Sequence, residues 1–163
     1  MRLMDLRVEI NRNLDLGSYA FPDVFCGFEG VAAVKAIFGG KTKEVLSKIK
    51  VILVSRRGYM HVDGETGDLH VSRSYLETAD ARYLYLDVIH ELVHIRQFHE
   101  GKELFDERYE YVDRPTEIQA YRVALKEARR IGYAGDELIE YLKVDWVSEE
   151  DFRRFLRLLG VGP

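Results

Sequence analysis

The amino-acid sequence predicts an α+β fold in one domain, and three observations lead to this prediction. The chain has 163 residues, of which 47% are hydrophobic, enough for one core of ordinary size. Short β-rich runs come first, within residues 50–76, and helical periodicity replaces them from residue 79 onward. No internal repeat, low-complexity stretch or linker divides the sequence, so we expect residues 1–163 to form a single domain.

The first half of the chain predicts strands with one interrupted helix among them. Residues 4–10 alternate in polarity as a short strand does, and residues 31–49 have helical spacing that is broken at Gly39-Gly40. Three β-rich runs follow, at residues 50–55, 59–62 and 68–76. Glycine-containing turns separate these runs, so they predict a small sheet, antiparallel or mixed.

Four helices are predicted in the second half. They span roughly residues 79–100, 115–131, 136–143 and 148–159. Ser148 opens the last helix, with Asp151 three residues further on, and Gly160 closes it. Its apolar residues recur at helical spacing, which favours a face packed on the core: Phe152, Phe155, Leu156 and Leu159.

The composition excludes several classes of function. A net charge of −4 with both signs interspersed does not favour nucleic acid or anionic membranes as partners. No apolar run approaches the roughly 20 residues that span a bilayer, and the N-terminus is too charged for a signal peptide, so we expect a cytoplasmic protein. Cys26 is the only cysteine, which excludes an internal disulfide and a multi-thiolate zinc site. Any metal must therefore sit on histidine and carboxylate.

Residues 88–101, VIHELVHIRQFHEG, hold three of the five histidines, and two of these bracket a glutamate as His90-Glu91-x-x-His94. Residues four apart share one face of a helix, so both imidazoles can reach one ion about 2.0–2.1 Å away. Glu91 lies about 100° around the helix from His90, near enough to act on a water at the same metal. The pattern predicts a metal site with a general base; the alternative is two histidines that flank a glutamate by coincidence.

The helix that carries this motif is expected to be buried on most sides. Two adjacent apolar stripes run along it, formed by Leu84, Val88, Leu92 and Ile95, and by Leu86, Ile89 and Val93. The polar groups are confined to one narrow face, made of Tyr83, Asp87, His90, Glu91, His94, Gln97 and Phe98. A cleft is therefore expected along that face.

Catalytic zinc takes three protein ligands, so a third side chain is needed. His99 lies on the opposite side of the helix from His90, and Cys26, beside two phenylalanines, is typical of a small buried hydrophobe. Glu117 is the better candidate, because it stands in the first turn of a helix that Pro115 opens.

The helix face that carries Glu117 favours burial of this carboxylate. Ala120, Ala124 and Ala128 lie on or beside that face and permit close approach of the motif helix. A buried carboxylate needs a partner, which a divalent cation would supply. The alternative is that Glu117 stabilises the helix N-terminus or pairs with Arg114.

With His90-Glu91-x-x-His94 and the downstream Glu117, residues 50–132 resemble a compact, single-domain zincin metallopeptidase of the gluzincin pattern. The resemblance implies a small sheet packed on the active-site helix, a helical C-terminal part, and a zinc ion held by His90, His94 and Glu117. It implies hydrolysis of peptide bonds in a peptide or protein substrate, with Glu91 as general base on a metal-bound water. By the same analogy, Leu69, His70 and Val71 belong to the sheet edge along which the substrate lies.

Several roles stay open at this point. Many gluzincins carry an aspartate where Tyr121 stands, so the groups that orient the histidines or contact the transition state are open among Asp87, Tyr111 and Tyr121. Tyr109 and His70 are further candidates for stabilising the tetrahedral intermediate. The segment 103–114 is either a lid or a solvated loop, and residues 1–30 form either an edge strand with a loop or a cover over the site.

Two other functions remain as alternatives. The metal could only stabilise a non-catalytic or sensing domain, although a structural zinc site prefers four closed ligands and does not need Glu91. The same activated water could also hydrolyse another amide or an ester, because the motif specifies the water better than the substrate.

Overall fold

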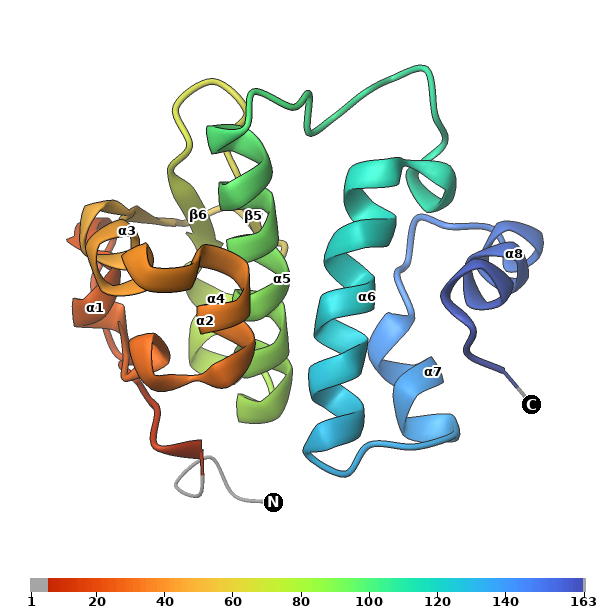
Figure 1. The fold of residues 1–163 in the computed structure, drawn as a ribbon, viewed down its shortest axis with the longest axis horizontal. Coiled ribbons are helices and arrows are strands. Elements are labelled where there is room, and N and C mark those ends of the chain that lie inside the picture. The colour runs from red at the N-terminus through yellow and green to blue at the C-terminus, as the bar shows by residue number, and fades with distance from the viewer. Residues whose placement is uncertain (1–5, 163) are drawn as a thin grey trace.

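The protein adopts a mixed α+β fold, with 55% of its residues in helices and 13% in strands, which confirms the predicted fold class. The computed structural model describes residues 6–162. Figure 1 shows the sheet and the N-terminal helices on one side of the long helix α5, Ala81–His99, and the C-terminal helices on the other side. None of the described helices combines the length and the apolarity that crossing a membrane requires.

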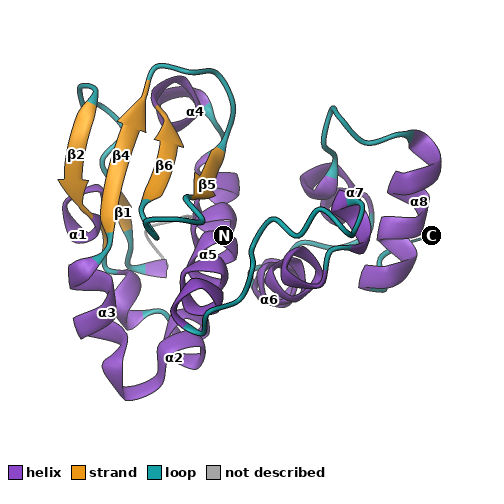
Figure 2. Ribbon diagram, turned by 90° about the horizontal axis from the view of Figure 1, so that it is seen from above, coloured by secondary structure: helices purple, strands orange, loops and turns teal. Residues whose placement is uncertain are grey.

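The main sheet has four strands in the order β2-β4-β6-β5 (Figure 2). These strands are β2, Gly17–Ala20; β4, Lys50–Val54; β6, Leu69–Ser72; and β5, Met60–Val62. β4 pairs with β6 in parallel, whereas β2 and β5 pair antiparallel to their neighbours, so the sheet is mixed. Strand β2 was not predicted, because its four residues start with glycine and show no apolar alternation.

Two predictions about the run at residues 68–76 are corrected by the structure. Only its first part is a strand, because β6 ends at Ser72 and helix α4, Arg73–Thr78, follows directly. In addition, β6 lies between β4 and β5, so the prediction that Leu69, His70 and Val71 form the sheet edge is wrong. The parallel pairing of β4 with β6 puts β6 inside the sheet and leaves β5, which precedes it in the chain, at the edge.

The N-terminal segment packs on the core and supplies β2, the edge strand opposite β5. β1, Glu9–Ile10, pairs with β3, Phe25–Cys26, while residues 4 and 5 of the predicted first strand lie outside the described residues. A short helix α1, Phe21–Val24, precedes β3. The helix predicted at 31–49 is interrupted at the glycine pair as expected, and it forms α2, Ala32–Phe38, and α3, Thr42–Lys48.

Helix α5 forms the centre of the core. All seven residues of its two apolar stripes are at most 1% exposed, as predicted. Helix α6, Pro115–Arg130, packs along α5, and its residues Ala120, Ala124 and Ala128 are fully buried. The small side chains let the two helix backbones approach closely, as the sequence predicted.

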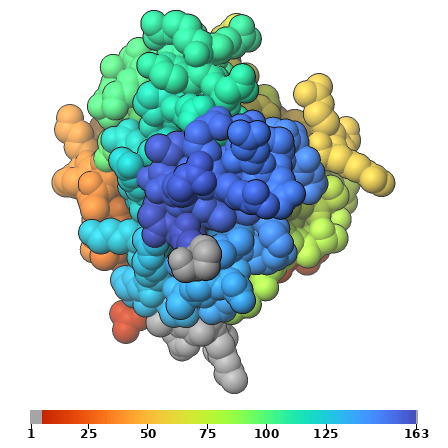
Figure 3. Space-filling view, turned by 90° about the vertical axis from the view of Figure 1, so that its right-hand side faces the viewer, coloured from red at the N-terminus to blue at the C-terminus, as the bar shows by residue number. Residues whose placement is uncertain are grey.

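Two further helices complete the C-terminal part, α7, Asp136–Leu142, and α8, Glu149–Leu159. The Ser148 side chain accepts a hydrogen bond from the Asp151 N–H at 3.1 Å, and Gly160 ends α8 in the left-handed conformation. Of the predicted packing face, Phe155 is fully buried, Leu159 is buried, and Phe152 and Leu156 are partly buried. Figure 3 shows that the C-terminal residues cover the middle of this side of the molecule.

Candidate metal centre

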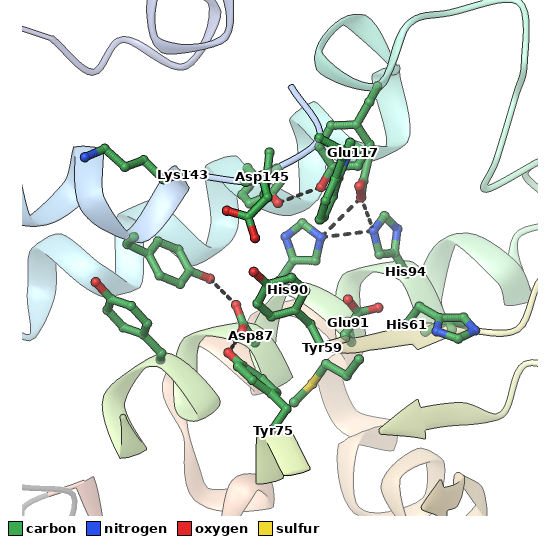
Figure 4. Close-up of a pocket in the computed structure, with 18 of the residues that line it drawn as sticks. Tyr59, His61, Tyr75, Asp87, His90, Glu91, His94, Glu117, Lys143 and Asp145 are labelled. Atoms are coloured by element: carbon green, nitrogen blue, oxygen red, sulfur yellow. Dashed lines mark hydrogen bonds and ion pairs between the residues drawn. The ribbon is translucent and has the colours of Figure 1, made fainter. Parts of the chain in front are cut away.

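Three side chains converge where α5 faces the first turn of α6: His90, His94 and Glu117 (Figure 4). The His90 Nε2 atom lies 3.1 Å from His94 Nε2 and 3.2 Å from Glu117 Oε1, and His94 Nε2 also contacts Glu117 Oε1. A tetrahedral metal with bonds of about 2.0–2.1 Å would separate its ligand atoms by about 3.3–3.4 Å. The three residues are 5–6% exposed, and this buried group could hold a metal ion.

The positions of these ligands follow from local structure. The two histidines are one turn apart on α5, and Glu117 is the third residue of α6, which begins at Pro115. Glu117 points inward as predicted, and its ionic contacts are the two histidines rather than Arg114. The alternative of an ion pair with Arg114 is therefore wrong.

The charges in this group compensate one another. Burial by itself would raise the pKa of Glu117, but the hydrogen bonds with His90 and His94 outweigh it and hold that pKa well below its ordinary value. Burial lowers the pKa of His94, yet the hydrogen bond with Glu117 and the charge of Glu91 together raise it to about 9. A proton on His94 thus balances the buried carboxylate, and a divalent cation would replace it as counter-charge.

Gln97 holds the imidazole of His94 in a fixed orientation. The Nδ1–H of His94 donates to Gln97 Oε1 at 2.7 Å, which leaves Nε2 free to face the other two ligands. The Gln97 side chain is fully buried, and its Nε2 donates to the carbonyl of Thr116 at 3.0 Å and to Gln119 Oε1 at 2.7 Å. Histidine ligands of metals commonly have such a partner on the second ring nitrogen. The sequence placed Gln97 on the polar face of the helix but assigned it no role.

Glu91 is buried beside the ligands without being one of them. It is 6% exposed, and its Oε2 atom has no hydrogen-bond partner among the described residues. Burial raises the pKa of Glu91 to about 7, against the opposing effect of His94 and His90. A carboxylate with such a pKa can exchange protons near neutral pH.

These groups open into a cavity of about 480 Å³. Its walls are rich in aromatic side chains: Tyr59, Tyr75, Tyr83, Phe105, Tyr111, Tyr121, Tyr141 and Trp146. Trp146 and Tyr59 are 58% and 43% exposed, and their ring centroids are 6.1 Å apart, so they stand at the mouth. The expected cleft along the polar face of α5 is therefore present, but Gln97 and Phe98 of that face do not line it.

Asp87, Tyr111 and Tyr121, the candidates for orienting the histidines or contacting the transition state, all make hydrogen bonds beside the cavity. Asp87 accepts a hydrogen bond from the Tyr141 hydroxyl at 2.8 Å and another from Tyr75, so it joins α5 to α7 and α4. Burial raises the pKa of Asp87 despite these hydrogen bonds. The hydroxyls of Tyr111 and Tyr121 are 2.7 Å apart, and both residues line the cavity.

Other predicted candidates lie elsewhere. Tyr109 and His70 do not line the cavity, nor do Leu69 and Val71 of β6. His99 is exposed at the end of α5, as its position opposite His90 implied. Cys26 is exposed, so the prediction of a buried hydrophobe is wrong: side chains alternate along β3, and its neighbour Phe25 takes the inward position.

The two segments of uncertain position can now be placed. Segment 103–114 borders the cavity through Phe105, Tyr111 and Arg114, while its residues Leu104 and Val112 are buried in the core. None of the described residues before Tyr59 lines the cavity, so the described part of residues 1–30 does not cover it.

Sequence reasoning missed most of the cavity wall. Tyr59, Tyr75, Tyr141 and Trp146 come from four separate stretches of the chain, and no common spacing relates them to the histidine motif.

A comparison of the chain with models of protein families, with curated proteins and with solved structures finds no match.

Proposed function

We propose that this protein is a zinc-dependent peptidase with a zincin-like active site. One observation carries the proposal: a buried group of His90, His94 and Glu117 stands beside a buried carboxylate, Glu91, that is not part of the group and faces the same cavity. A site that served only to bind a metal would not need Glu91, because burying an unpartnered carboxylate is costly.

The donor set favours zinc as the metal. Two imidazoles and one carboxylate are a common ligand set of catalytic zinc, which keeps a coordination position open for water or substrate. Zinc bound here would polarise a carbonyl oxygen and acidify water at neutral pH. Gln97 supports this choice, because it fixes the His94 tautomer that leaves Nε2 available as a ligand.

We assign the proton transfers to Glu91. Its carboxylate takes a proton from the attacking water and passes it to the leaving nitrogen of the peptide bond. In the metal-free protein burial raises the pKa of Glu91 to about 7, and a cation bound beside it would lower that pKa and favour the carboxylate that accepts the proton. The hydroxyls of Tyr111 and Tyr121, which share a hydrogen bond in the cavity wall, are the best candidates to donate to the developing oxyanion.

The strand β5 is the best candidate for contact with an extended substrate. It forms the edge of the sheet next to the cavity, and all three of its residues line that cavity. An edge strand offers free backbone N–H and C=O groups, with which a peptide can pair as an additional strand. This assignment replaces the one that the sequence suggested for β6.

Two alternatives remain. A non-catalytic domain stabilised by zinc would share the ligands, but three protein ligands beside an open cavity suit a catalytic site better than a structural one. A hydrolase of another amide or of an ester would share both the ligands and Glu91.

The proposal is tested by offering an unbiased peptide pool to the zinc-loaded protein and reading cleavage by mass spectrometry. The matched control is Glu91→Gln, which keeps the shape of the side chain and is expected to hold equal zinc. Cleavage by the parent alone supports a peptidase in which Glu91 is the base, whereas His94→Ala should lose the metal. Equal cleavage by the parent and Glu91→Gln would contradict the role of Glu91, and no cleavage by either would favour one of the alternatives.

A further inference from the structure

Four of the five histidines stand in two pairs, and only one pair belongs to the candidate metal centre. The second pair is His61 on β5 and His70 on β6, which are direct partners in the antiparallel ladder. Their ring centroids are 5.1 Å apart, close to the 4.8 Å that separates the rings of His90 and His94. Two imidazoles at this separation can share one ion.

A carboxylate lies beside the second pair, although the ligand atoms of all three residues do not come within the 4.8 Å that groups His90, His94 and Glu117, so side-chain rotation has to bring them together. The Oδ2 atom of Asp63 lies 3.8 Å from His70 Nε2. Its other oxygen, Oδ1, accepts hydrogen bonds from the backbone N–H groups of Glu65 and Thr66, at 2.8 and 3.1 Å. The turn after β5 therefore fixes the carboxylate while Oδ2 stays available to a ligand.

This group is distinct from the candidate metal centre, although His61 also borders the same cavity. Side chains alternate along a strand, and the neighbours of His61 and His70 in β5 and β6 are the buried ones, so the two imidazoles project from the outer face of the sheet. Figure 4 shows the His61 imidazole directed away from His90, His94 and Glu117. The side chains of His70 and Asp63 are 27% and 32% exposed, so an ion in water can reach them.

We propose that His61, His70 and Asp63 form a second site for a divalent first-row transition metal such as Zn²⁺. Two imidazoles and one carboxylate are the donor types that such metals take, and water would fill the remaining positions. The site is more exposed than the first, so it binds more weakly.

The consequence of binding concerns the edge of the sheet. β5 has only three residues and pairs with β6 alone. An ion held by His61 and His70 would join these two strands through their side chains. The second site would thus stabilise the strand that borders the cavity, whether or not the protein is a peptidase.

Zinc stoichiometry tests this proposal directly. The protein is dialysed against a series of free Zn²⁺ concentrations, and bound zinc is measured by inductively coupled plasma mass spectrometry. We expect two equivalents in the parent, of which the weaker is lost in His61→Asn and in His70→Asn, and the tighter in His94→Asn. His99→Asn, which removes an exposed histidine outside both groups, should keep two. A parent that binds one equivalent, or a weaker equivalent that survives both substitutions, would overturn the proposal.

A second measurement locates the metal without reference to turnover. In His94→Asn, which lacks one member of the first group, Cu²⁺ serves as a paramagnetic probe of histidine ring protons in nuclear magnetic resonance spectra. The signals of His61 and His70 should broaden first and that of His99 last. Equal broadening of all three would show only non-specific binding and would refute the site. Loss of peptidase activity, in contrast, bears on the proposed function alone.

Discussion

Replacing Gln97 by leucine should weaken zinc binding about 10–100-fold, which corresponds to about 1.4–2.7 kcal/mol of binding free energy. Leucine can occupy much of the buried space of Gln97 but has no polar atom to accept the 2.7 Å hydrogen bond from His94 Nδ1. The imidazole would then lose the group that sets its tautomer and orientation. The two ring nitrogens of His94 would compete for the proton, and Nε2 would be free less often.

The same substitution should also destabilise the metal-free protein. The His94 Nδ1 atom would be left without its hydrogen bond inside the protein, because the residue is 5% exposed. An unsatisfied buried polar group costs about 1–3 kcal/mol. The denaturant midpoint of the metal-free variant should therefore fall, while the dependence of the unfolding free energy on denaturant concentration stays unchanged.

Competition with a fluorescent chelator at fixed pH measures the zinc affinity, and urea denaturation measures the stability. The matched control is Gln119→Leu, which removes the 2.7 Å hydrogen bond with Gln97 Nε2 but leaves the contact with His94 intact. Its effect on zinc affinity should be much smaller. A folded Gln97→Leu protein that binds zinc as tightly as the parent would refute the orienting role.

Two further predictions follow from burial and charge. Zinc affinity should rise with pH up to about 9, because the raised pKa of His94 means that the metal must displace its proton. For the same reason the His94 contribution to the stability of the metal-free protein is fully present below the ordinary pKa of 6.5 and is lost as pH rises through 9. Urea denaturation across pH 6–10 tests this. An equally large loss of stability with rising pH in metal-free His94→Asn would contradict it. Phe155→Ala should cost about 3–5 kcal/mol, since this fully buried ring packs 5.0 Å from Tyr121, whereas Leu158→Ala, at a 41% exposed position, should stay within about 0.5 kcal/mol. Equal denaturant midpoints for these last two variants would contradict the packing described.

Apart from α1 and α4, the helices could be predicted, as could the candidate metal ligands, because their determinants are local. Two histidines four residues apart share a helix face wherever that helix lies, and Pro115 with Glu117 marks the first turn of α6 without any tertiary contact. The buried stripes of α5 and the alanines of α6 then indicated which faces meet. The convergence of Glu117 with the histidines followed from these faces, although Glu117 lies 23 residues after His94 in the sequence.

Other features depend on contacts that no local pattern encodes. The prediction of the edge strand was wrong because β4 pairs with β6 and not with the intervening β5, and a strand's own residues do not say which neighbour it will take. The exposure of Cys26 depends on which side of β3 faces the core.

The sequence by itself determined the α+β class, the helices other than α1 and α4, and the residues of the candidate metal centre, because helical periodicity and capping act over a few residues. Only the tertiary structure decided which strand lies at the edge, which aromatic side chains wall the cavity, and that His61 and His70 face each other. These features arise from pairing and packing between distant segments, whose free energies depend on the whole core rather than on neighbouring residues.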